Sequence, residues 1–241
     1  MKPGTVALAT LPLFAKFSAS QIASLNDISD VARVGPDETL YRQGDRLDAL
    51  HILLAGTIAE THADAYENAL TDIISPIAPI GFAQSILGAV SATGAKTITF
   101  ARLIIIPAPE LRTIIRAKPA LSLPFFEYAL ARMCEQTLDI CHLKRQSSVQ
   151  RLAGFLLGLI EDPESSPVRL ALPYDKRFIA VKIGCSKENL SRAFAALRSV
   201  GVQTQKGVVV VNDVPRLRAF ARPALIAYTN FAPRSPSPGE P

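Results

Sequence analysis

The stretch from Pro173 to Val211 constrains the fold of this chain more than any other part of the sequence. A short amphipathic pattern ends at Gly184, and Ser186 follows where a second helix would begin and need a cap. The apolar residues of this second segment repeat at helical spacing: Leu190, Phe194 and Leu197. This order predicts a helix, a tight turn and a second helix, which is the helix-turn-helix arrangement.

Polar side chains gather on the opposite face of the second predicted helix, at Glu188, Ser191 and Arg192. Arginine can donate two hydrogen bonds to guanine, glutamate can accept one from cytosine, and serine suits either base edge. Small residues that would permit close approach accompany them: Ala193, Ala195 and Ala196. The face therefore predicts base recognition in a major groove. An ordinary solvated helix face has a similar composition, so the motif alone leaves a purely structural helix pair open.

The residues around this helix pair predict a winged domain over 148–222. Gly201 is placed to end the second helix, and 202–205, Lys206-Gly207 and 208–211 then read as strand, tight turn and strand. The other elements expected in this domain are a helix over 148–160, a loop over 163–167, a strand over 168–172 and a last helix that Asp213 caps and that runs through Phe220.

The 173–211 stretch resembles the DNA-binding domain of the CRP/FNR superfamily of bacterial transcription regulators. The run from Gly184 to Arg192, Gly-Cys-Ser-Lys-Glu-Asn-Leu-Ser-Arg, is similar to the recognition-helix motif of that superfamily. Its Glu-x-x-Ser-Arg pattern resembles the FNR-type subgroup, which reads TTGA-like half-sites. The DNA-contacting residues that the resemblance implies are Ser186, Lys187, Glu188, Ser191, Arg192 and Lys206. Within this set the glutamate and the arginine read bases, while Lys206 contacts phosphate from the wing.

The resemblance covers about residues 10–222 and is strongest over 173–200. The run Leu172-Pro-Tyr-Asp-Lys-Arg, taken with Glu188-Asn-Leu-Ser-Arg-Ala-Phe, looks like the FtrB-type branch of the superfamily. The effectors of that branch do not transfer to this chain.

Residues 1–118 predict an effector-sensing β-roll. Apolar positions between 11 and 33 indicate a short helical entry, which Ser18 or Ser20 can cap. Short apolar strands follow, and glycines separate them: Gly35, Gly44 and Gly56. This pattern is similar to the first half of the cyclic-nucleotide-binding β-roll, the sensor domain of the same superfamily.

The second half of the predicted roll departs from the nucleotide-binding pattern. Members that bind cyclic nucleotides have a Gly-Glu pair for the ribose and, some ten residues on, an arginine for the phosphate. Here Gly81 is followed by Phe82, and the segment to Ala95 contains neither an acid nor an arginine. Lys96 aligns poorly with the phosphate position. Because a desolvated phosphate without a cationic partner is costly, we expect that cyclic AMP is not the ligand.

The same segment predicts an apolar effector pocket in place of a nucleotide site. Its expected lining is Ile80, Phe82, Ile86, Leu87 and Val90, backed by Ile104 to Ile106. An apolar effector, a haem or no small ligand at all is compatible with such a lining. Apolar strand residues usually pack against one another, so simple filling of the roll is at least as good an interpretation.

A long helix is predicted from Pro119 to about Ser148, with 119–147 as the dimerisation segment. Its apolar positions alternate by three and four residues, as in a coiled-coil seam: Leu123, Phe126, Leu130, Met133, Thr137 and Ile140. Two copies of the helix predict a homodimer, and a two-fold protein reads a palindrome. Residues 223–241 are rich in Pro, Ser and Gly, and are predicted to form a flexible tail.

Cys134 and Cys141 lie seven residues apart on this helix and are candidate redox sensors or soft ligands. The pattern favours small buried hydrophobes instead. With Cys185 the chain has an odd number of cysteines and no close-spaced metal set, so neither a disulfide framework nor a metal site is predicted. An N-terminal iron–sulfur cluster is disfavoured because no cysteine precedes Cys134. The other soft candidates for haem ligation are His51, His62, His142 and Met133.

Composition narrows the function class. The net charge of +5 and the pI near 9.2 are compatible with a polyanion partner. The N-terminus lacks the layout of a secretion signal, and Pro76 and Pro79 interrupt the uncharged 73–95 segment, so we expect a cytoplasmic chain without a membrane span. The sequence contains no Gly-x-Ser-x-Gly, P-loop or His-Glu-x-x-His motif, so we expect no enzyme.

Together these patterns predict an α+β chain with a β-roll, a long dimerisation helix and a winged helix-turn-helix. The function expected is a homodimeric DNA-binding transcription regulator, activator or repressor, that senses an effector or redox signal other than cyclic AMP. Its expected partners are double-stranded DNA, a second copy of the chain and, by the resemblance, RNA polymerase. The alternative is a nucleotide-sensing regulatory module that binds no DNA.

Overall fold

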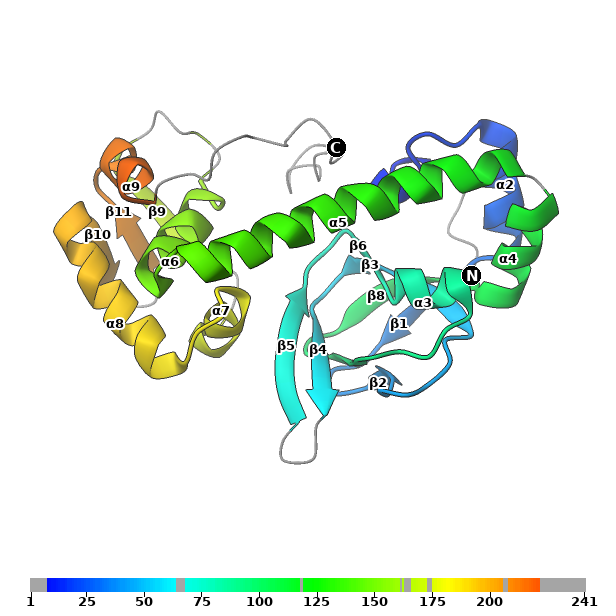
Figure 1. The fold of residues 1–241 in the computed structure, drawn as a ribbon, viewed down its shortest axis with the longest axis horizontal. Helices are drawn as coiled ribbons and strands as arrows, with labels where there is room; N and C mark the ends of the chain where they lie inside the picture. Colours follow the sequence, from blue (N-terminus) through cyan, green and yellow to red (C-terminus); the bar gives the residue numbers. More distant parts are fainter. Residues whose placement is uncertain are drawn as a thin grey trace. The chain divides into compact units, whose positions relative to one another are not determined.

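The computed structural model describes residues 8–63, 68–117, 119–160, 162, 166–172, 175–205 and 208–221. The chain divides into two compact units, Met1–Met133 and Cys134–Tyr228. Helix α5 (Ser122–Arg145) contributes residues to both units (Figure 1). Antiparallel sheets with short helices form the first unit, and a helix-turn-helix with its own small sheet forms the second. The predicted α+β class is confirmed. The predicted domain boundaries stay a prediction, and the tail over 223–241 lies outside the described residues.

Two four-stranded antiparallel sheets form the roll of the first unit. One has the order β1 (Asp30–Val34), β8 (Ala101–Pro107), β3 (Ala49–Ala55) and β6 (Ala78–Ile80). The other has the order β2 (Thr39–Tyr41), β7 (Gly94–Thr97), β4 (Ile58–Ala63) and β5 (Asn68–Ile74). Two of the glycines predicted to lie in turns, Gly44 and Gly56, do lie between strands, and both have a positive φ.

Strands β3 and β8 separate two apolar cores, because successive side chains of a strand point to opposite faces. In the pairing of β3 with β8, Ile52 lies opposite Ile104 and Leu53 lies opposite Leu103. The isoleucine pair packs toward the helices, and the leucine pair packs inside the roll. All four side chains are fully buried, and each such burial stabilises a fold by about 1.5–3 kcal/mol.

Short helices cover one side of the roll. They are η1 (Pro12–Phe14), α2 (Ala19–Ile28), α3 (Phe82–Leu87), α4 (Ala108–Ala117) and η2 (Pro119–Leu121). Ser18 is the N-cap of helix α2. Its hydroxyl accepts a hydrogen bond from the amide of Gln21, while the Gln21 side chain accepts one from the amide of Ser18. The predicted cap is therefore part of a capping box. Figure 1 shows α2 and α4 lying side by side, next to the start of α5.

An aromatic cluster fixes the first turns of α5 to the first unit. Phe125 is buried, and its ring lies 5.2 Å from that of Phe17 and 5.8 Å from that of Phe82. Phe82 also meets Tyr128 at 5.1 Å, edge to face, a geometry that aromatic pairs favour. Phe82, which follows Gly81 where the nucleotide-binding pattern has an acid, is thus an apolar packing residue.

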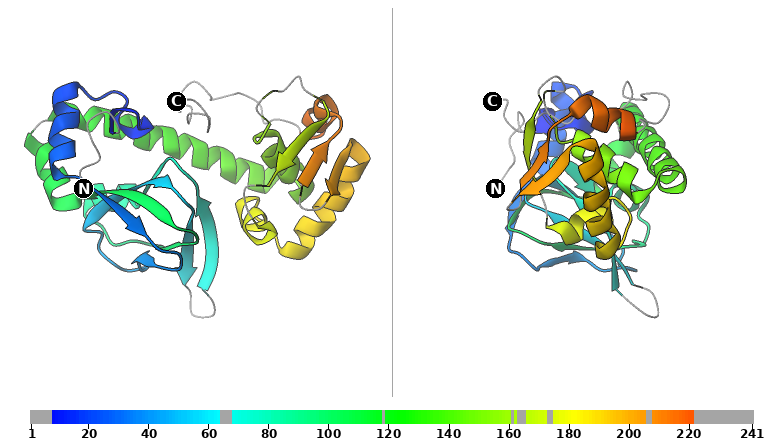
Figure 2. Two further views of the ribbon diagram at one scale, coloured as in Figure 1. Left: turned by 180° about the vertical axis from the view of Figure 1, so that it is seen from behind. Right: turned by 90° about the vertical axis from the view of Figure 1, so that its left-hand side faces the viewer.

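The second unit begins with the end of α5 and continues through α6 (Ser148–Leu157), β9 (Val168–Ala171), α7 (Lys176–Lys182), α8 (Lys187–Leu197), η3 (Arg198–Val200), β10 (Val202–Gln205), β11 (Val208–Val211) and α9 (Val214–Ala221). Strand order in its antiparallel sheet is β10, β11, β9 (Figure 2). The helices pack over one core, which includes Leu152, Leu156, Ile179, Leu190, Leu197, Val209 and Leu217. Helix α6 ends at Leu157, three residues before the predicted end, because Gly158 follows it as the C-cap.

The last helix has the predicted start. The amide of Arg216 donates to the Asp213 carboxylate at 2.9 Å, so Asp213 caps α9. Among the helices of the described residues, none has the length and apolar character that a bilayer span requires.

Candidate nucleic-acid interface

The turn between α7 and α8 is fixed by its backbone. Gly184 has a φ of +65°, where residues with a side chain are strained. The amide of Cys185 donates to the carbonyl of Ala180 at 2.9 Å and closes the turn. The Ser186 hydroxyl then accepts from the amide of Asn189 at 3.2 Å. Ser186 is therefore the N-cap of α8, as its sequence position predicts.

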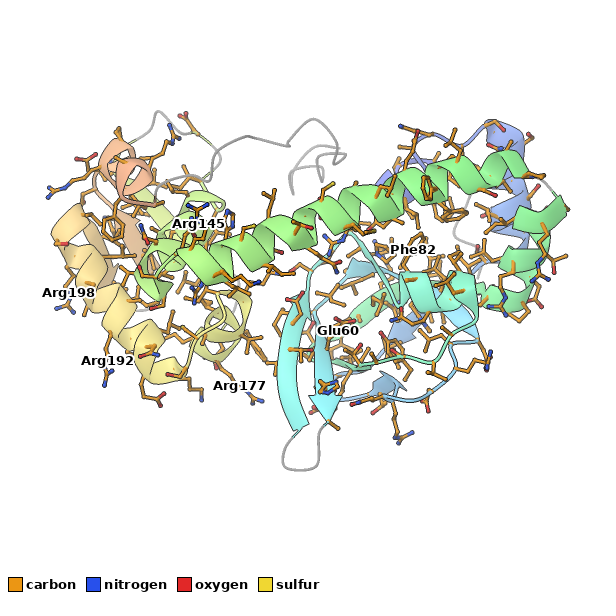
Figure 3. All side chains as sticks on the ribbon, in the orientation of Figure 1. Glu60, Phe82, Arg145, Arg177, Arg192 and Arg198 are labelled. Carbon is orange, nitrogen blue, oxygen red and sulfur yellow. The ribbon has the colours of Figure 1, made fainter. Side chains whose placement is uncertain are left out.

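Helix α8 has one buried and one exposed face. The buried face joins the core of the second unit through Leu190, Ala193, Phe194 and Leu197. Glu188, Ser191 and Arg192 are exposed, together with Lys187. Figure 3 shows Arg192 projecting away from α8. The structure therefore brings Glu188, Ser191 and Arg192, which are predicted to contact bases, together on one exposed surface. We call this surface the reading face.

One residue of the expected close-approach set does not belong to this surface. Ala193 is buried in the core, so its assignment to the reading face was wrong. It follows Leu190 by three positions, which places both residues on the same side of the helix. Ala195 and Ala196 are exposed.

Local hydrogen bonds set the charge state of the reading face. The amide of Glu188 and the hydroxyl of Ser186 lower the pKa of the Glu188 carboxyl, so the side chain is ionised at neutral pH and acts as an acceptor. The hydroxyl of Ser191 donates to the carbonyl of Lys187 at 3.1 Å. Its oxygen therefore remains able to accept a bond from a base or a phosphate.

The second unit carries further arginines that the sequence reasoning did not single out. Figure 3 shows Arg177 on α7, Arg198 beyond the end of α8 and Arg145 at the end of α5. Arg177 stacks near the ring of Phe178, at 5.9 Å from its centroid. In the sequence, the only sign of these residues is that arginines are frequent on both sides of the run from Gly184 to Arg192. Arg177 and Arg198 lie toward the two ends of α8, so they add positive charge on either side of the exposed face, and a phosphate backbone is attracted to such charge.

Arg151 on α6 is a second residue that the sequence reasoning missed. Its Nε donates to the carbonyl of Ile183 at 2.6 Å, and its Nη2 donates to that of Gly184 at 3.0 Å. Its Nη1 donates to the carbonyl of Gln146 at 2.6 Å, just beyond the end of α5. One guanidinium therefore joins the turn before α8 to the segment that follows the long helix.

Strands β10 and β11 form the predicted hairpin, with Val202 paired to Val211 and Gln205 to Val208. Strand β9 pairs with the other edge of β11. Lys206, the expected wing contact, lies outside the described residues.

The structure does not gather the five residues expected to line an effector pocket. Ile80 is buried inside the roll, whereas Phe82 and Ile86 pack against the core beneath the helices. Leu87 and Val90 are 77% and 58% exposed, so their assignment to a buried pocket was wrong. The reason is local: residues 82–87 form helix α3, which turns Leu87 to a different side from Phe82 and Ile86, and Val90 lies beyond the end of that helix.

A cavity of about 460 Å³ lies elsewhere in the roll, lined by Leu40, Tyr41, Asp45, Arg46, Leu47, Asp48, Ala49 and His51. Burial lowers the pKa of His51, so this imidazole is neutral at pH 7.

His62, another histidine that the sequence offers as a soft ligand, contacts the carbonyl of Ala92 at 3.0 Å through its Nδ1. Within the described ranges, no three His, Cys, Asp or Glu side chains are grouped as metal ligands.

Both helix cysteines, Cys134 and Cys141, are exposed. The interpretation of them as small buried hydrophobes was therefore wrong for the single chain, and the redox hypothesis stays a prediction. Cys185 is partly buried, and burial raises the pKa of its thiol while nearby Arg151 opposes the rise.

The seam residues of α5 also lie on the surface of the single chain. Those exposed are Leu123, Phe126, Leu130, Met133, Thr137 and Ile140. The neighbouring Leu143 extends the same apolar strip. These side chains face away from the aromatic cluster that fixes the start of the helix, so the chain by itself leaves them uncovered.

Comparison with known proteins agrees with this geometry. Residues 150–220 match the Crp-like helix-turn-helix domain. No curated protein matches the sequence. The fold is similar to that of a Ruegeria pomeroyi protein described as a candidate cyclic nucleotide binding protein, with 23% identity, a TM-score of 0.65, and 90% of this chain and 96% of that chain covered.

Two further solved structures share the fold. CLP of Xanthomonas campestris, described as a c-di-GMP responsive global regulator, is 17% identical with a TM-score of 0.64, covering 81% of this chain and 100% of that one. FixK2 of Bradyrhizobium japonicum is 16% identical with a TM-score of 0.64, covering 80% and 97%. The likeness confirms the two-part fold, and the FtrB-type branch stays a prediction. Residues 150–220 of this chain therefore belong to the Crp-like helix-turn-helix domain family, and the chain as a whole shares the fold of these solved structures.

Proposed function

We propose that this chain is a homodimeric transcription regulator that reads a palindromic, TTGA-like operator. The observation that carries the proposal is the exposed Glu188, Ser191 and Arg192 face on a helix whose other side is locked into a core. The side chains have the donors and acceptors that base edges in the major groove require. Their helix is capped and anchored, so its reading groups are positioned before DNA arrives.

Dimerisation is supported by the uncovered seam of α5. Its residues recur at alternating three- and four-residue intervals, the spacing of two helices packed knobs into holes. Phe126 and Met133 are among the most exposed large apolar side chains of the described residues. An apolar strip of this length is costly in water, and a second copy would cover it. A two-fold axis along α5 would present two reading helices to two half-sites.

An effector other than cyclic AMP is supported by the residues at the start of α3. Phe82 packs among aromatic rings, and the 81–95 segment supplies no arginine to a phosphate. RNA polymerase is a further partner that the resemblance implies. The effector would act by shifting the population between dimer geometries, and thereby the separation of the reading helices.

Fluorescence anisotropy with two labelled duplexes tests the proposal. One duplex carries two TTGA half-sites about 10 base pairs apart centre to centre, and the other has scrambled half-sites. We expect affinity for the palindrome to exceed that for the scrambled duplex by about 10³-fold at 150 mM salt. Equal affinities would refute operator reading. Sedimentation at the same protein concentration gives the second readout, and a chain that binds the palindrome as a monomer would refute the homodimer.

A further inference from the structure

A row of polar residues crosses the inner face of the β2–β7–β4–β5 sheet. Tyr41 on β2 pairs with Ala95 on β7, Ala95 pairs with Glu60 on β4, and Glu60 pairs with Asp72 on β5. Directly paired residues of an antiparallel sheet share one face. Tyr41 and Ala95 are buried in the core of the roll, so the whole row looks inward. Ala95 is small, which leaves the side chains of Tyr41 and Glu60 free to face each other across it.

The hydroxyl of Tyr41 is unsatisfied. The residue is 6% exposed, and its oxygen is buried without a hydrogen-bond partner. The carboxyl of Glu60 and the hydroxyls of Ser91 and Thr93 face it closely enough to influence its ionisation, but none of them meets hydrogen-bond geometry. Such an orphaned polar group in a native fold calls for an explanation, and a missing ligand is one.

The charges around the row favour a cation. Burial raises the pKa of Glu60, and the neighbouring charge of Asp72 raises it further. Arg132, an exposed residue of α5, lowers that pKa, so its guanidinium is attracted to the same carboxyl. Two carboxyls face one guanidinium, and an anionic ligand would be repelled. Figure 3 shows Glu60 on β4, at the end of the strand that lies near α5.

We propose that the inner face of this sheet binds a small organic cation with a primary ammonium group, using the carboxylates of Glu60 and Asp72 and the hydroxyl of Tyr41. An ammonium has three donors, which match the two carboxylates and the phenol oxygen at once. Arg132 is the chain's own cation at this site, and the ligand competes with it. Its displacement loosens α5 from the roll. This inference rests on the proposed function, because it assigns a chemical class to the effector of that regulator.

Titration calorimetry of the full chain with putrescine, a small diamine, tests the site in the absence of DNA. Its uncharged counterpart, 1,4-butanediol, is the ligand control. We expect saturable binding of putrescine only, weakened roughly tenfold or more in Glu60→Gln, because a hydrogen bond to a charged group is lost. Glu110→Gln alters an exposed carboxyl on α4 and is expected to bind as the parent does. In Arg132→Gln the competitor is gone, so putrescine should bind more tightly.

Tyr41→Phe separates a ligand role from a structural one. Because the hydroxyl has no partner, we expect the variant without ligand to melt at or above the temperature of the parent, while putrescine binding weakens. A lower melting temperature would show that the hydroxyl is already satisfied by the protein, and would overturn the proposal. So would equal heats for putrescine and butanediol, or unchanged binding in Glu60→Gln. Failure here leaves operator binding intact, and failure of operator binding leaves the calorimetry interpretable.

Discussion

The guanidinium of Arg151 donates a hydrogen bond from its Nε to the carbonyl oxygen of Ile183 at 2.6 Å. Ile183 is the C-cap of α7, at the turn that leads into helix α8. The same guanidinium also bonds Gln146, beyond the end of α5. A movement of the long helix is therefore transmitted to the turn through one planar, fork-shaped group.

Arg151→Ala should lower both stability and operator affinity. The substitution removes the donor of four backbone carbonyl oxygens. We expect a loss of about 2–3 kcal/mol in the free energy of unfolding, measured by urea denaturation. Arg151→Lys keeps the charge but not the fork, so it should recover part of the stability and less of the affinity. If the alanine variant unfolded and bound DNA as the parent does, these bonds would have no role in holding the turn.

Arg192→Ala should lose affinity together with sequence preference. A bidentate contact to guanine is worth about 1–3 kcal/mol, so the variant should bind the palindrome more weakly and tolerate substitution of one guanine per half-site. Arg177→Ala is the matched control, since an arginine that contacts phosphate should weaken all duplexes alike and reduce the salt slope by about 1. Anisotropy against single-base variants of the operator distinguishes the two. Identical base preferences in the parent and in Arg192→Ala would contradict the assigned role.

Leu130→Glu should convert the dimer to monomers. Leu130 is exposed in the single chain and lies in the middle of the seam, so a charge there would be buried against its own copy at the dimer axis. We expect monomers by sedimentation and loss of palindrome binding, with no change in the thermal unfolding of the roll. Cys141→Ser, an exposed change beside the seam on the same helix, should remain dimeric. Dimeric Leu130→Glu would place the interface elsewhere.

Glu60→Gln should stabilise the chain at neutral pH. Burial and the charge of Asp72 raise the pKa of Glu60 from its ordinary value of 4.5. A carboxyl with a higher pKa in the folded than in the unfolded chain binds its proton more tightly when folded, so stability falls as pH rises from about 4.5 through the folded pKa. The glutamine variant avoids this loss. Thermal unfolding at pH 7 and pH 4 should show a gain in melting temperature that shrinks at the lower pH, and a constant gain would exclude titration of Glu60 as its cause.

Local patterns in the sequence were sufficient to predict the second unit. Capping by Ser186 and Asp213 and the helical repeat of Leu190 and Phe194 are all settled by neighbouring residues. Gly201 ends the 3-10 turn η3, whereas α8 itself already ends at Leu197. A cap or a turn depends on a few consecutive backbone groups, and these are visible in the order of the residues.

The first unit was predicted less well. The segment after Gly81 is apolar, and the same composition fits a pocket wall, a packed core or a short helix. The segment forms helix α3, which places Leu87 at the surface and Phe82 beside the rings of Phe125 and Tyr128 on α5. The spacing of apolar residues alone does not distinguish a helix from a strand in such a short run. Contacts with distant segments determine which of its faces are buried.

The sequence by itself determined the helix-turn-helix, the exposed polar face of its second helix, the antiparallel roll and the apolar period of the long helix, because each follows from short-range spacing. Only the tertiary structure decided that Ala193 belongs to the core, that Arg151 bridges α6 to the turn, and that Tyr41 faces Glu60 across Ala95. Those relations join residues that are far apart along the chain or depend on strand register. Register and packing are properties of the whole fold, and no local stretch of sequence contains them.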